Sequence, residues 1–203
     1  MVGIIDYGVG NLFSLQSSFT AIGEDVMVSS DPDVLRKADH ILLPGVGAFE
    51  DAVGKLRQSG LDEMVYEAVR EGKPLMGICL GMQMLFEKSF EYGEHQGLGL
   101  LKGQVIPMAG LLPADLKIPH MGWNGLNITK PDGKLFRNTK EGAYVYFVHS
   151  YFASGCDDSL AARTEYGAWL TAAVEKDNIF GSQFHPEKSG EAGLDILRAF
   201  CAV

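Results

Sequence analysis

Residues 74–88 read PLMGICLGMQMLFEK, an apolar run that passes into an amphipathic pattern. The first five residues form the continuous apolar run expected of a strand covered on both faces, and the remainder favours a helix. Gly77 and Gly81 flank Cys79 in the arrangement G-x-nucleophile-x-G, which is typical of a sharp turn between a strand and a helix. Glycine suits both positions because the backbones of neighbouring elements approach closely there. The stretch therefore predicts a parallel α/β sheet with Cys79 at the end of one strand.

Strand-like and helix-like segments alternate through the first half of the chain and return at its end. The pattern predicts strands over 2–6, 26–29, 41–43, 74–78 and 179–184, and helices over 11–22, 32–38, 49–72, 80–88 and 190–201. From about Gly97 to Tyr166 it changes to short β-like runs, among them 124–129 and 143–148, which predict an antiparallel extension. We therefore expect one α/β domain over residues 1–203. Its doubly wound, mostly parallel central sheet is flanked by helices and carries a small antiparallel extension.

The composition restricts the partners and the compartment. With 46% hydrophobic residues in a chain of 203, a full core can be buried. The formal net charge of -9 argues against nucleic acid and membrane partners, because phosphate backbones and anionic lipids bind clustered lysine and arginine. The N-terminal MVGIIDYG lacks the features of a secretion signal, and the longest apolar stretch, 143–153, is too short to cross a bilayer. We expect a cytoplasmic protein.

The three cysteines are expected to differ in role. Their odd number and wide spacing predict neither a disulfide framework nor a thiolate metal site. Cys79 is expected to be a nucleophile, since the predicted turn places its sulfur at a helix N-terminus, where the thiolate is favoured. A buried structural cysteine is the alternative for Cys79, and either that or a surface position is the expectation for Cys156 and Cys201.

A base and its orienting acid are predicted in the segment QFHPE, residues 183–187. His185 and Glu187 are two residues apart, so they point to the same side of an extended backbone, and Pro186 restricts the chain between them. A His-x-Glu pair also occurs in zinc deaminases, but these need a following P-C-x-x-C, which this chain lacks, so no metal is expected. Without the turn at Cys79, the pair would suggest only a helix-capping histidine and a solvated glutamate.

Attack on an amide places negative charge on its oxygen, and backbone N–H donors must stabilise that charge. The Leu80 N–H, directly after Cys79, is one candidate. The second is expected in Pro44-Gly45-Val46-Gly47, with Val46 and Gly47 as donors, although an ordinary turn is the alternative. Gln83 lies one helical turn beyond Cys79 and is a candidate to bind the polar end of a substrate, unless it is simply a surface residue.

These motifs together resemble the class I glutamine amidotransferases. The resemblance rests on GICLGMQ around Cys79, HPE at 185–187 and PGVG at 44–47, and it spans nearly the whole chain, as a single type 1 amidotransferase domain. Four further segments resemble more specifically the glutaminase subunits of imidazole glycerol phosphate synthases: DYGVGNL at 6–12, PGVGAF at 44–49, HMGWN at 120–124 and YFVHSY at 146–151.

The resemblance implies a reaction and a partner, without a cofactor. Such subunits hydrolyse L-glutamine and form a heterodimer with a (β/α)8 cyclase subunit, the whole being a lyase complex. Ammonia passes through the barrel of the cyclase, which makes imidazole glycerol phosphate and aminoimidazole carboxamide ribonucleotide in histidine biosynthesis. Low turnover is expected until the cyclase binds its nucleotide, with rotation of a peptide in the Gly45-Val46-Gly47 segment as the candidate switch.

The resemblance also implies site residues. Cys79 is implied as nucleophile, His185 as general base and acid, and Glu187 as its orienting partner. The remaining residues fall into a glutamine-binding group and a cyclase-facing group: Gly45, Gly47, Gln83, Glu91, His149, Ser150 and Tyr151, and then Asn11, Trp123, Tyr146 and Lys188. Glu91 lies in the loosely patterned KSFEYGEHQ, so Glu87 or Glu94 are alternatives to it.

Other interpretations remain open from sequence alone. Trp123 and Tyr146 are also consistent with core aromatic residues, and His149 with a core histidine whose hydrogen bonds are satisfied. His40, His95 and His120 are expected to be structural, and shaping of the interface through the HMGWN turn is an alternative for His120. The protein could also be another class I amidotransferase subunit, a cysteine peptidase or γ-glutamyl hydrolase on the same scaffold, or a scaffold subunit without activity.

Overall fold

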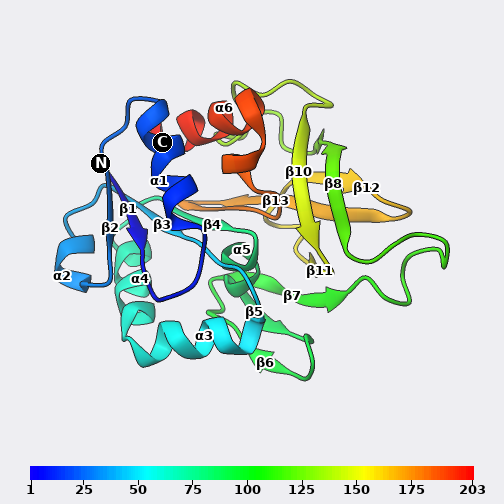
Figure 1. Cartoon of the computed structure of the whole chain (residues 1–203), viewed down its shortest axis with the longest axis horizontal. Coiled ribbons are helices and arrows are strands. Elements are labelled where there is room, and N and C mark those ends of the chain that lie inside the picture. Colours follow the sequence, from blue (N-terminus) through cyan, green and yellow to red (C-terminus); the bar gives the residue numbers. More distant parts are fainter.

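The computed structural model describes residues 1–203, which are built around an eight-stranded sheet (Figure 1). In sheet order the strands are β2 (Val26–Ser29), β1 (Val2–Ile5), β3 (His40–Leu43), β4 (Leu75–Ile78), β14 (Ile179–Ser182), β13 (Trp169–Lys176), β12 (Leu160–Glu165) and β9 (Asn127–Ile128). The first five are parallel to one another, and the last three continue the sheet in antiparallel fashion. The carboxyl ends of β3, β4 and β14 therefore meet at one edge of the sheet, as parallel strands require.

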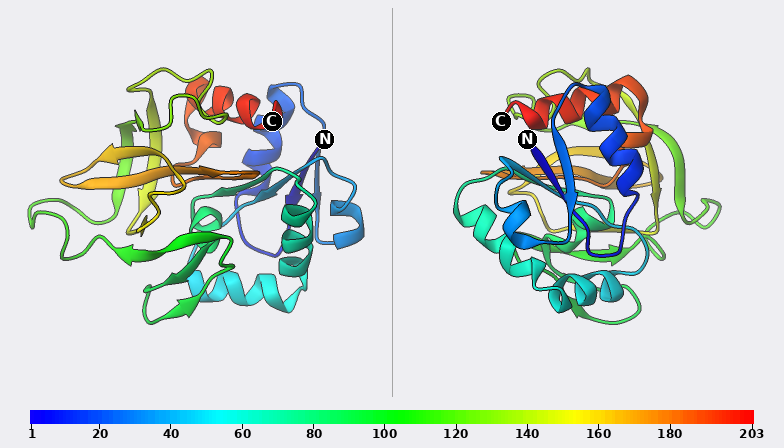
Figure 2. Two further views of the ribbon diagram at one scale, coloured as in Figure 1. Left: turned by 180° about the vertical axis from the view of Figure 1, so that it is seen from behind. Right: turned by 60° about the vertical axis from the view of Figure 1, so that its left-hand side comes forward.

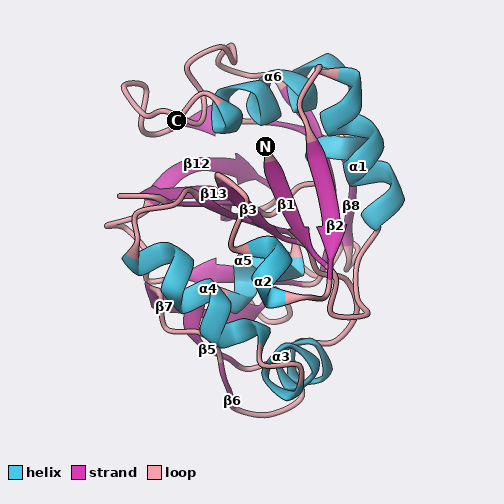
Figure 3. Cartoon of the chain, turned by 90° about the vertical axis from the view of Figure 1, so that its left-hand side faces the viewer, coloured by secondary structure: helices cyan, strands magenta, loops and turns pink.

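Helices cover both faces of this sheet (Figure 3). One face carries α1 (Leu12–Ala21) and α6 (Gly190–Cys201), and the other carries α2 (Pro32–Leu35), α3 (Phe49–Gln58), α4 (Leu61–Arg70) and α5 (Leu80–Met84). Side chains of β3 alternate between the two cores: Ile41 and Leu43 face the α3–α4 side and Leu42 faces α1 and α6. The predicted doubly wound α/β fold is confirmed. No helix has both the length and the apolar character needed to cross a membrane.

Two smaller sheets form the predicted extension (Figure 2), which is antiparallel except where β5 and β7 pair in parallel. The two-stranded one pairs β8 (His120–Gly125) with β10 (Tyr144–His149), and the other contains β11 (Tyr151–Ser154), β7 (Leu101–Pro107), β5 (Phe86–Ser89) and β6 (His95–Gln96). The β8–β10 ribbon lies at the end of the molecule away from both termini. A short 3₁₀ helix, η1 (Pro186–Lys188), joins the central sheet to α6.

Two predicted helices are wrong in extent. The helix expected over 80–88 ends at Met84, because Phe86–Ser89 pairs with β7, and the hydrogen bonds of that sheet replace helical ones. The helix expected over 49–72 is interrupted at Gly60, whose φ of 70° belongs to the left-handed region. The hydrophobic periodicity continues across both breaks. Each break is set by the packing of the element that follows it, β5 in the first case and α4 in the second.

Candidate active site

Cys79 occupies a strained turn between β4 and α5. Its φ of 55° and ψ of −111° are unusual for a residue with a side chain, and such backbone strain concentrates at functional sites. Gly77 is required there because a Cβ would lie 2.6 Å from the Gly81 carbonyl oxygen, and a Cβ on Gly45 would lie 2.5 Å from the Gly81 nitrogen. A Cβ on Gly81 would overlap the Leu43 carbonyl oxygen. Three glycines thus let the end of β3 cross directly over the turn.

His185 and Glu187 follow the neighbouring strand, β14, and form a close pair. The His185 Nδ1 lies 2.8 Å from Glu187 Oε1, and the two side chains are only 5% and 1% exposed. His185 is also held from outside the loop, since its backbone N–H donates to the Tyr146 carbonyl oxygen at 2.9 Å. Both Cys79 and His185 line the same cavity, so the two ends of adjacent strands bring the sulfur and the imidazole together.

The surroundings of His185 favour its protonated form. Burial by itself lowers the pKa, but hydrogen bonds to Cys79 and Glu187 and the negative charges of both outweigh burial and raise the pKa to about 10. At neutral pH the imidazole therefore carries a proton on both nitrogens. Nδ1 donates to Glu187, and Nε2 is left to face the sulfur.

The cavity around Cys79 has a volume of about 570 Å³, which is in the range of small-molecule sites. Its lining comes from the turn at Cys79, the segment after β3, the loop after β5, the segments next to β7 and β8, and the end of β10. These residues are Val46, Gly47, Cys79, Leu80, Gln83, Glu91, Tyr92, Pro107, Ala109, Ile118, Pro119, Val148, His149, Ser150, Tyr151 and His185. No group of three or more His, Cys, Asp or Glu side chains is placed to hold a metal ion.

Gln83 and Glu91 are two polar side chains of this lining, and each is held by hydrogen bonds. Gln83 is buried rather than on the surface, and its amide nitrogen donates to the Tyr151 carbonyl oxygen at 3.0 Å and to Gln183 Oε1 at 2.9 Å. Glu91 reaches the cavity while its Oε2 accepts from the Phe49 N–H at 2.5 Å.

The two glutamates considered as alternatives to Glu91 lie outside the cavity. Glu87 accepts a hydrogen bond from the Gly103 N–H at 2.9 Å, and Glu94 pairs with Lys88 at 3.3 Å. Both line a separate surface hollow. Of the three candidates, the structure brings only Glu91 to Cys79.

The segment after β3 borders the cavity and contains backbone N–H groups without an acceptor in the protein. The backbone N–H groups of Val46 and Gly47 donate no hydrogen bond to any other group of the protein. Leu80, the first residue of α5, has an N–H without an intrahelical acceptor, as the first turn of every helix does. These three residues line the cavity, whereas Gly45 does not and lies against the turn at Cys79.

Comparison with known proteins shows the family to which the chain belongs. The family model of glutamine amidotransferase class-I matches residues 3–202. The chain belongs to the class I glutamine amidotransferases. It is 49% identical over 201 residues to the imidazole glycerol phosphate synthase subunit HisH of Caldanaerobacter subterraneus, covering 98% of this chain and 97% of the relative. It is 50% identical over 203 residues to the subunit of the same name from Methanothermobacter thermautotrophicus, covering 100% and 98%.

Solved structures support the amidotransferase fold. The PurLQS structure from Thermotoga maritima contains a chain that superposes with a TM-score of 0.75 at 21% identity, covering 99% of this chain and 97% of the other. A crystal structure described as a glutamine amidotransferase superposes with a TM-score of 0.76 at 20% identity, with the same two coverages. At these identities the likeness establishes the fold alone.

The four amidotransferase residues expected to face a partner lie on or near one surface. Trp123 is 55% exposed, so it is not a core residue, and its ring lies 6.2 Å from that of the partly exposed Tyr146. The Lys188 ammonium lies 5.9 Å from the centre of the Tyr146 ring. Asn11 caps the start of α1, which packs against η1, the element that contains Lys188.

Sequence reasoning missed Gln183 and Ser189. The amide nitrogen of Gln183 lies 3.8 Å from the Cys79 sulfur, and the Ser189 hydroxyl donates to the His185 carbonyl oxygen at 2.6 Å while accepting from the Tyr146 N–H at 3.0 Å. Gln183 could have been found, because it is two residues before His185 and an extended backbone over 183–185 would point both side chains to the same side. No sequence signal identifies Ser189, whose partners come from a distant strand.

The shifted pKa values of three histidines predict how the free energy of unfolding depends on pH. Burial lowers the pKa of His149 to about 3 and that of His120 to about 4, so both stay neutral in the native state. The unfolded chain binds protons at their ordinary pKa near 6.5, so their contribution to stability is present above that pH and is lost on acidification. For His185 the sign is reversed, and its contribution is present below pH 6.5 and lost towards pH 10.

We therefore expect the free energy of unfolding to fall on both sides of about pH 6.5. Each histidine contributes a slope of at most about 1.4 kcal/mol per pH unit. Urea unfolding between pH 5 and pH 9 measures it, a range in which ordinary carboxyl groups remain ionised. A stability that stays constant from pH 6.5 to pH 5 would contradict the buried neutral state of His120 and His149.

Proposed function

We propose that this chain is the glutaminase subunit of an imidazole glycerol phosphate synthase, which hydrolyses L-glutamine to glutamate and ammonia. The observation that carries the proposal is the meeting of the Cys79 sulfur and the His185 imidazole in one cavity, with the Glu187 carboxylate bonded to the imidazole from behind. The chain that forms it is about half identical, along its whole length, to two HisH subunits. The carboxamide of glutamine is the bond that this constellation would cleave.

The first half of the reaction begins with the Cys79 sulfur, which attacks the carboxamide carbon of glutamine. The C–S bond forms as the carbonyl oxygen takes the negative charge. The N–H groups of Leu80, Val46 and Gly47 stabilise this oxygen in the active state, since these residues line the cavity and their N–H groups have no acceptor in the protein. His185, already protonated, gives its Nε2 proton to the nitrogen as the C–N bond breaks, so ammonia leaves and a thioester remains.

The second half of the reaction uses the same histidine as a base. Having lost its proton, His185 takes one from water, and the resulting hydroxide attacks the thioester carbon. The C–S bond breaks, the new carboxylic acid gives its proton to solvent water as glutamate leaves, and Cys79 and His185 return to their starting charges. Glu187 keeps Nδ1 of His185 as a donor throughout, so only Nε2 exchanges protons in either step.

The polar end of glutamine is bound by the opposite wall of the cavity. The Glu91 carboxylate matches the charge of the α-ammonium group, and its second oxygen is not occupied by the Phe49 N–H. Backbone groups of His149, Ser150 and Tyr151 and the Gln83 side chain complete this wall. The side-chain carboxamide then extends towards Cys79.

A cyclase subunit with a (β/α)8 barrel is the proposed partner, in a heterodimer. It docks on the surface formed by Asn11, Trp123, Tyr146 and Lys188, next to the carbonyl that holds the His185 N–H. Ammonia passes through the barrel to the site that makes imidazole glycerol phosphate and aminoimidazole carboxamide ribonucleotide. Turnover is low until the cyclase binds its nucleotide, when the Val46–Gly47 segment completes the oxyanion site.

A glutaminase assay on this chain, alone and with the cyclase subunit and its nucleotide, tests the proposal. We expect ammonia release to rise by at least about tenfold in the complete complex, a modest coupling free energy for two sites. Full turnover by the chain alone, together with cleavage of γ-glutamyl peptides, would instead identify a γ-glutamyl hydrolase. Failure of a glutamine-like electrophile to modify Cys79 would favour a scaffold without activity.

A further inference from the structure

His120 and His149 form a hydrogen-bonded chain that the reaction described above does not use. The His149 Nδ1 lies 2.8 Å from the Tyr151 carbonyl oxygen, and its Nε2 lies 3.0 Å from Nδ1 of His120. The Nε2 of His120 lies 3.3 Å from the Asn124 amide nitrogen. The chain thus runs from β8 to the wall of the cavity.

The chemistry of its two ends determines every proton position in this chain. The Tyr151 carbonyl only accepts, so His149 carries its proton on Nδ1 and leaves Nε2 as an acceptor. His120 must then donate from Nδ1, and its own Nε2 accepts from the Asn124 amide. The second amide proton of Asn124 goes to the Glu165 carbonyl oxygen at 2.8 Å, so this nitrogen is a donor in both bonds.

The β8–β10 ribbon separates this chain from the partner-facing surface. His120 and His149 are directly opposite in the ladder and share its inner face, while Trp123 pairs with Tyr146 on the outer face. On β8 the alternation is clear, because His120 is buried whereas Met121 and Trp123 are 64% and 55% exposed.

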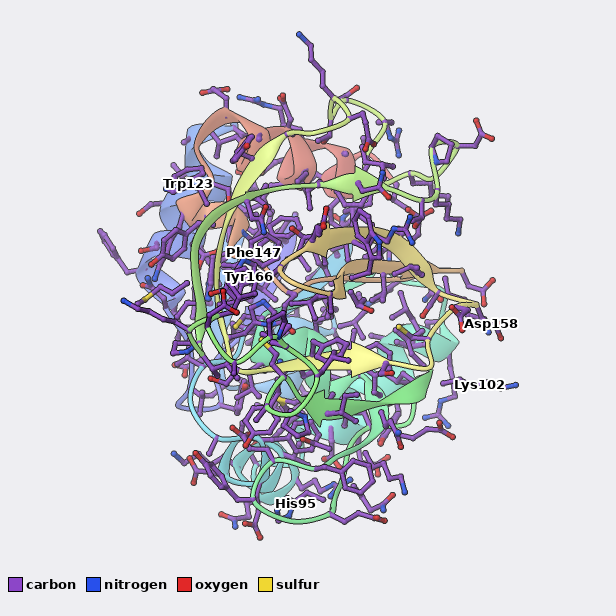
Figure 4. The ribbon with its side chains drawn as sticks, turned by 90° about the vertical axis from the view of Figure 1, so that its right-hand side faces the viewer. His95, Lys102, Trp123, Phe147, Asp158 and Tyr166 are labelled. Atoms are coloured by element: carbon purple, nitrogen blue, oxygen red, sulfur yellow. The ribbon has the colours of Figure 1, made fainter.

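Aromatic rings hold His120 in place. Its ring stacks between those of Phe147 and Tyr166, with centroids 4.7 Å and 4.2 Å away. Figure 4 shows Phe147 and Tyr166 on the inner side of the β8–β10 ribbon, with Trp123 near its outer side. The low pKa of each histidine, caused first by burial, agrees with a chain that is neutral at physiological pH. A protonated ring would place two donors face to face.

The end of the chain is shared with the proposed catalytic residues. The Tyr151 carbonyl oxygen accepts from both His149 and the Gln83 amide nitrogen. Gln83 in turn donates to Gln183, whose amide nitrogen reaches the Cys79 sulfur. The orientation of the 149–151 backbone and that of Gln83 therefore both depend on the Tyr151 carbonyl group. His149 donates to this carbonyl, and His120 in turn donates to His149.

We propose that His120 is a positioning residue for substrate binding, which sets the tautomer of His149 and thereby fixes the Tyr151 carbonyl and the glutamine-binding wall. The inference rests on the proposed function, since the bound molecule is glutamine. His120 lines no part of the cavity, so it acts only through His149. Loss of its N–H leaves the buried Nε2 of His149 without a donor and weakens binding, while the reactivity of the Cys79 sulfur stays unchanged.

Two substitutions separate the hydrogen bond from the ring stacking. His120→Leu removes both, whereas His120→Asn removes the ring but keeps an N–H near the former Nδ1, which Asn Nδ2 matches in distance from the backbone. The rate of inactivation by a glutamine-like electrophile with a diazo ketone group, measured against its concentration, gives an apparent dissociation constant and a limiting inactivation rate. Iodoacetamide measures the reactivity of Cys79 without a binding step.

We expect His120→Leu to raise the dissociation constant of the glutamine analogue by roughly fivefold to tenfold, the effect of one buried hydrogen bond. The limiting rate and the iodoacetamide rate should stay within about twofold of the parent chain, and His120→Asn should restore most of the binding. Equal loss in both variants would assign the effect to ring packing and overturn the proposal. An equal fall in the iodoacetamide rate would overturn it as well.

A second measurement does not depend on activity. Nitrogen-15 chemical shifts of the imidazoles at pH 7 should show His149 protonated on Nδ1 alone and should lose this preference in His120→Leu. The opposite tautomer in the parent chain would refute the ordered chain. If instead the tautomer is as expected but the analogue reacts no faster than its D-enantiomer, the proposed function fails while the His120–His149 chain stands.

Discussion

Replacement of Cys79 by serine is expected to lower ammonia release from glutamine by at least about 10³-fold in the complex with the cyclase. Serine has nearly the same shape, but its hydroxyl is a far weaker acid than a thiol, so His185 cannot hold the proton while oxygen stays negative. The positive charge of His185 depends partly on the sulfur, and its pKa should therefore fall in the variant. Ammonia release under saturating glutamine and nuclear magnetic resonance titration of His185 measure the two effects.

Cys156→Ser is the matched control for this experiment. Cys156 is buried like Cys79, but its sulfur lies 3.5 Å from the Thr171 hydroxyl, and burial raises its pKa. The control should retain activity within about twofold, because the hydroxyl can bond to Thr171. Iodoacetamide should label Cys79 first in the parent chain. Retained activity in Cys79→Ser would refute the role of the sulfur as nucleophile.

Gly81→Ala should abolish the turn at Cys79 and destabilise the whole protein. The new methyl group would overlap the Leu43 carbonyl oxygen and lie 3.1 Å from the Pro44 carbonyl carbon, both of which belong to backbone that cannot move aside. Overpacking of this kind costs roughly 3 kcal/mol or more when the neighbour is rigid. Activity should fall further than stability, because separation of β3 from the turn displaces the N–H groups of Val46 and Gly47. Urea unfolding and ammonia release measure both.

Gly54→Ala tests whether the Gly81 effect is specific to the site. Gly54 lies in the interior of α3 and a Cβ there would meet no atom within 4 Å. Alanine should stabilise the protein by about 0.5–1 kcal/mol through its better helix propensity, with unchanged activity. A Gly81→Ala protein as stable and active as the parent chain would show that β3 does not press on the turn as the structure describes.

Much of the fold was predictable from sequence, because its signals are local. The strand over 26–29 and the helix over 190–201 have the predicted bounds, since apolar periodicity and flanking polar residues lie within a few positions of each other. The helix expected over 80–88 failed because its second half pairs with β7, which begins at Leu101. Whether such an ambiguous segment becomes helix or strand depends on a pairing strand elsewhere in the chain, here β7.

In the candidate site, too, the features that were predicted from sequence are the local ones. The spacing G-x-C-x-G and the two-residue step from His185 to Glu187 follow from backbone geometry, so they were readable before any contact was known. Gln183, two residues before His185, was not predicted as a site residue, although the same spacing relates His185 to Glu187.

Sequence alone was therefore enough to specify the parallel α/β sheet, the turn at Cys79 and the pairing of His185 with Glu187, because each depends on residues that are neighbours in the chain. Tertiary structure decided which glutamate reaches the cavity, that Trp123 is exposed, and that His120 contacts His149. These outcomes depend on how separate strands pack and which polar groups are left to pair at their ends. That is a property of the whole core, which no local pattern records.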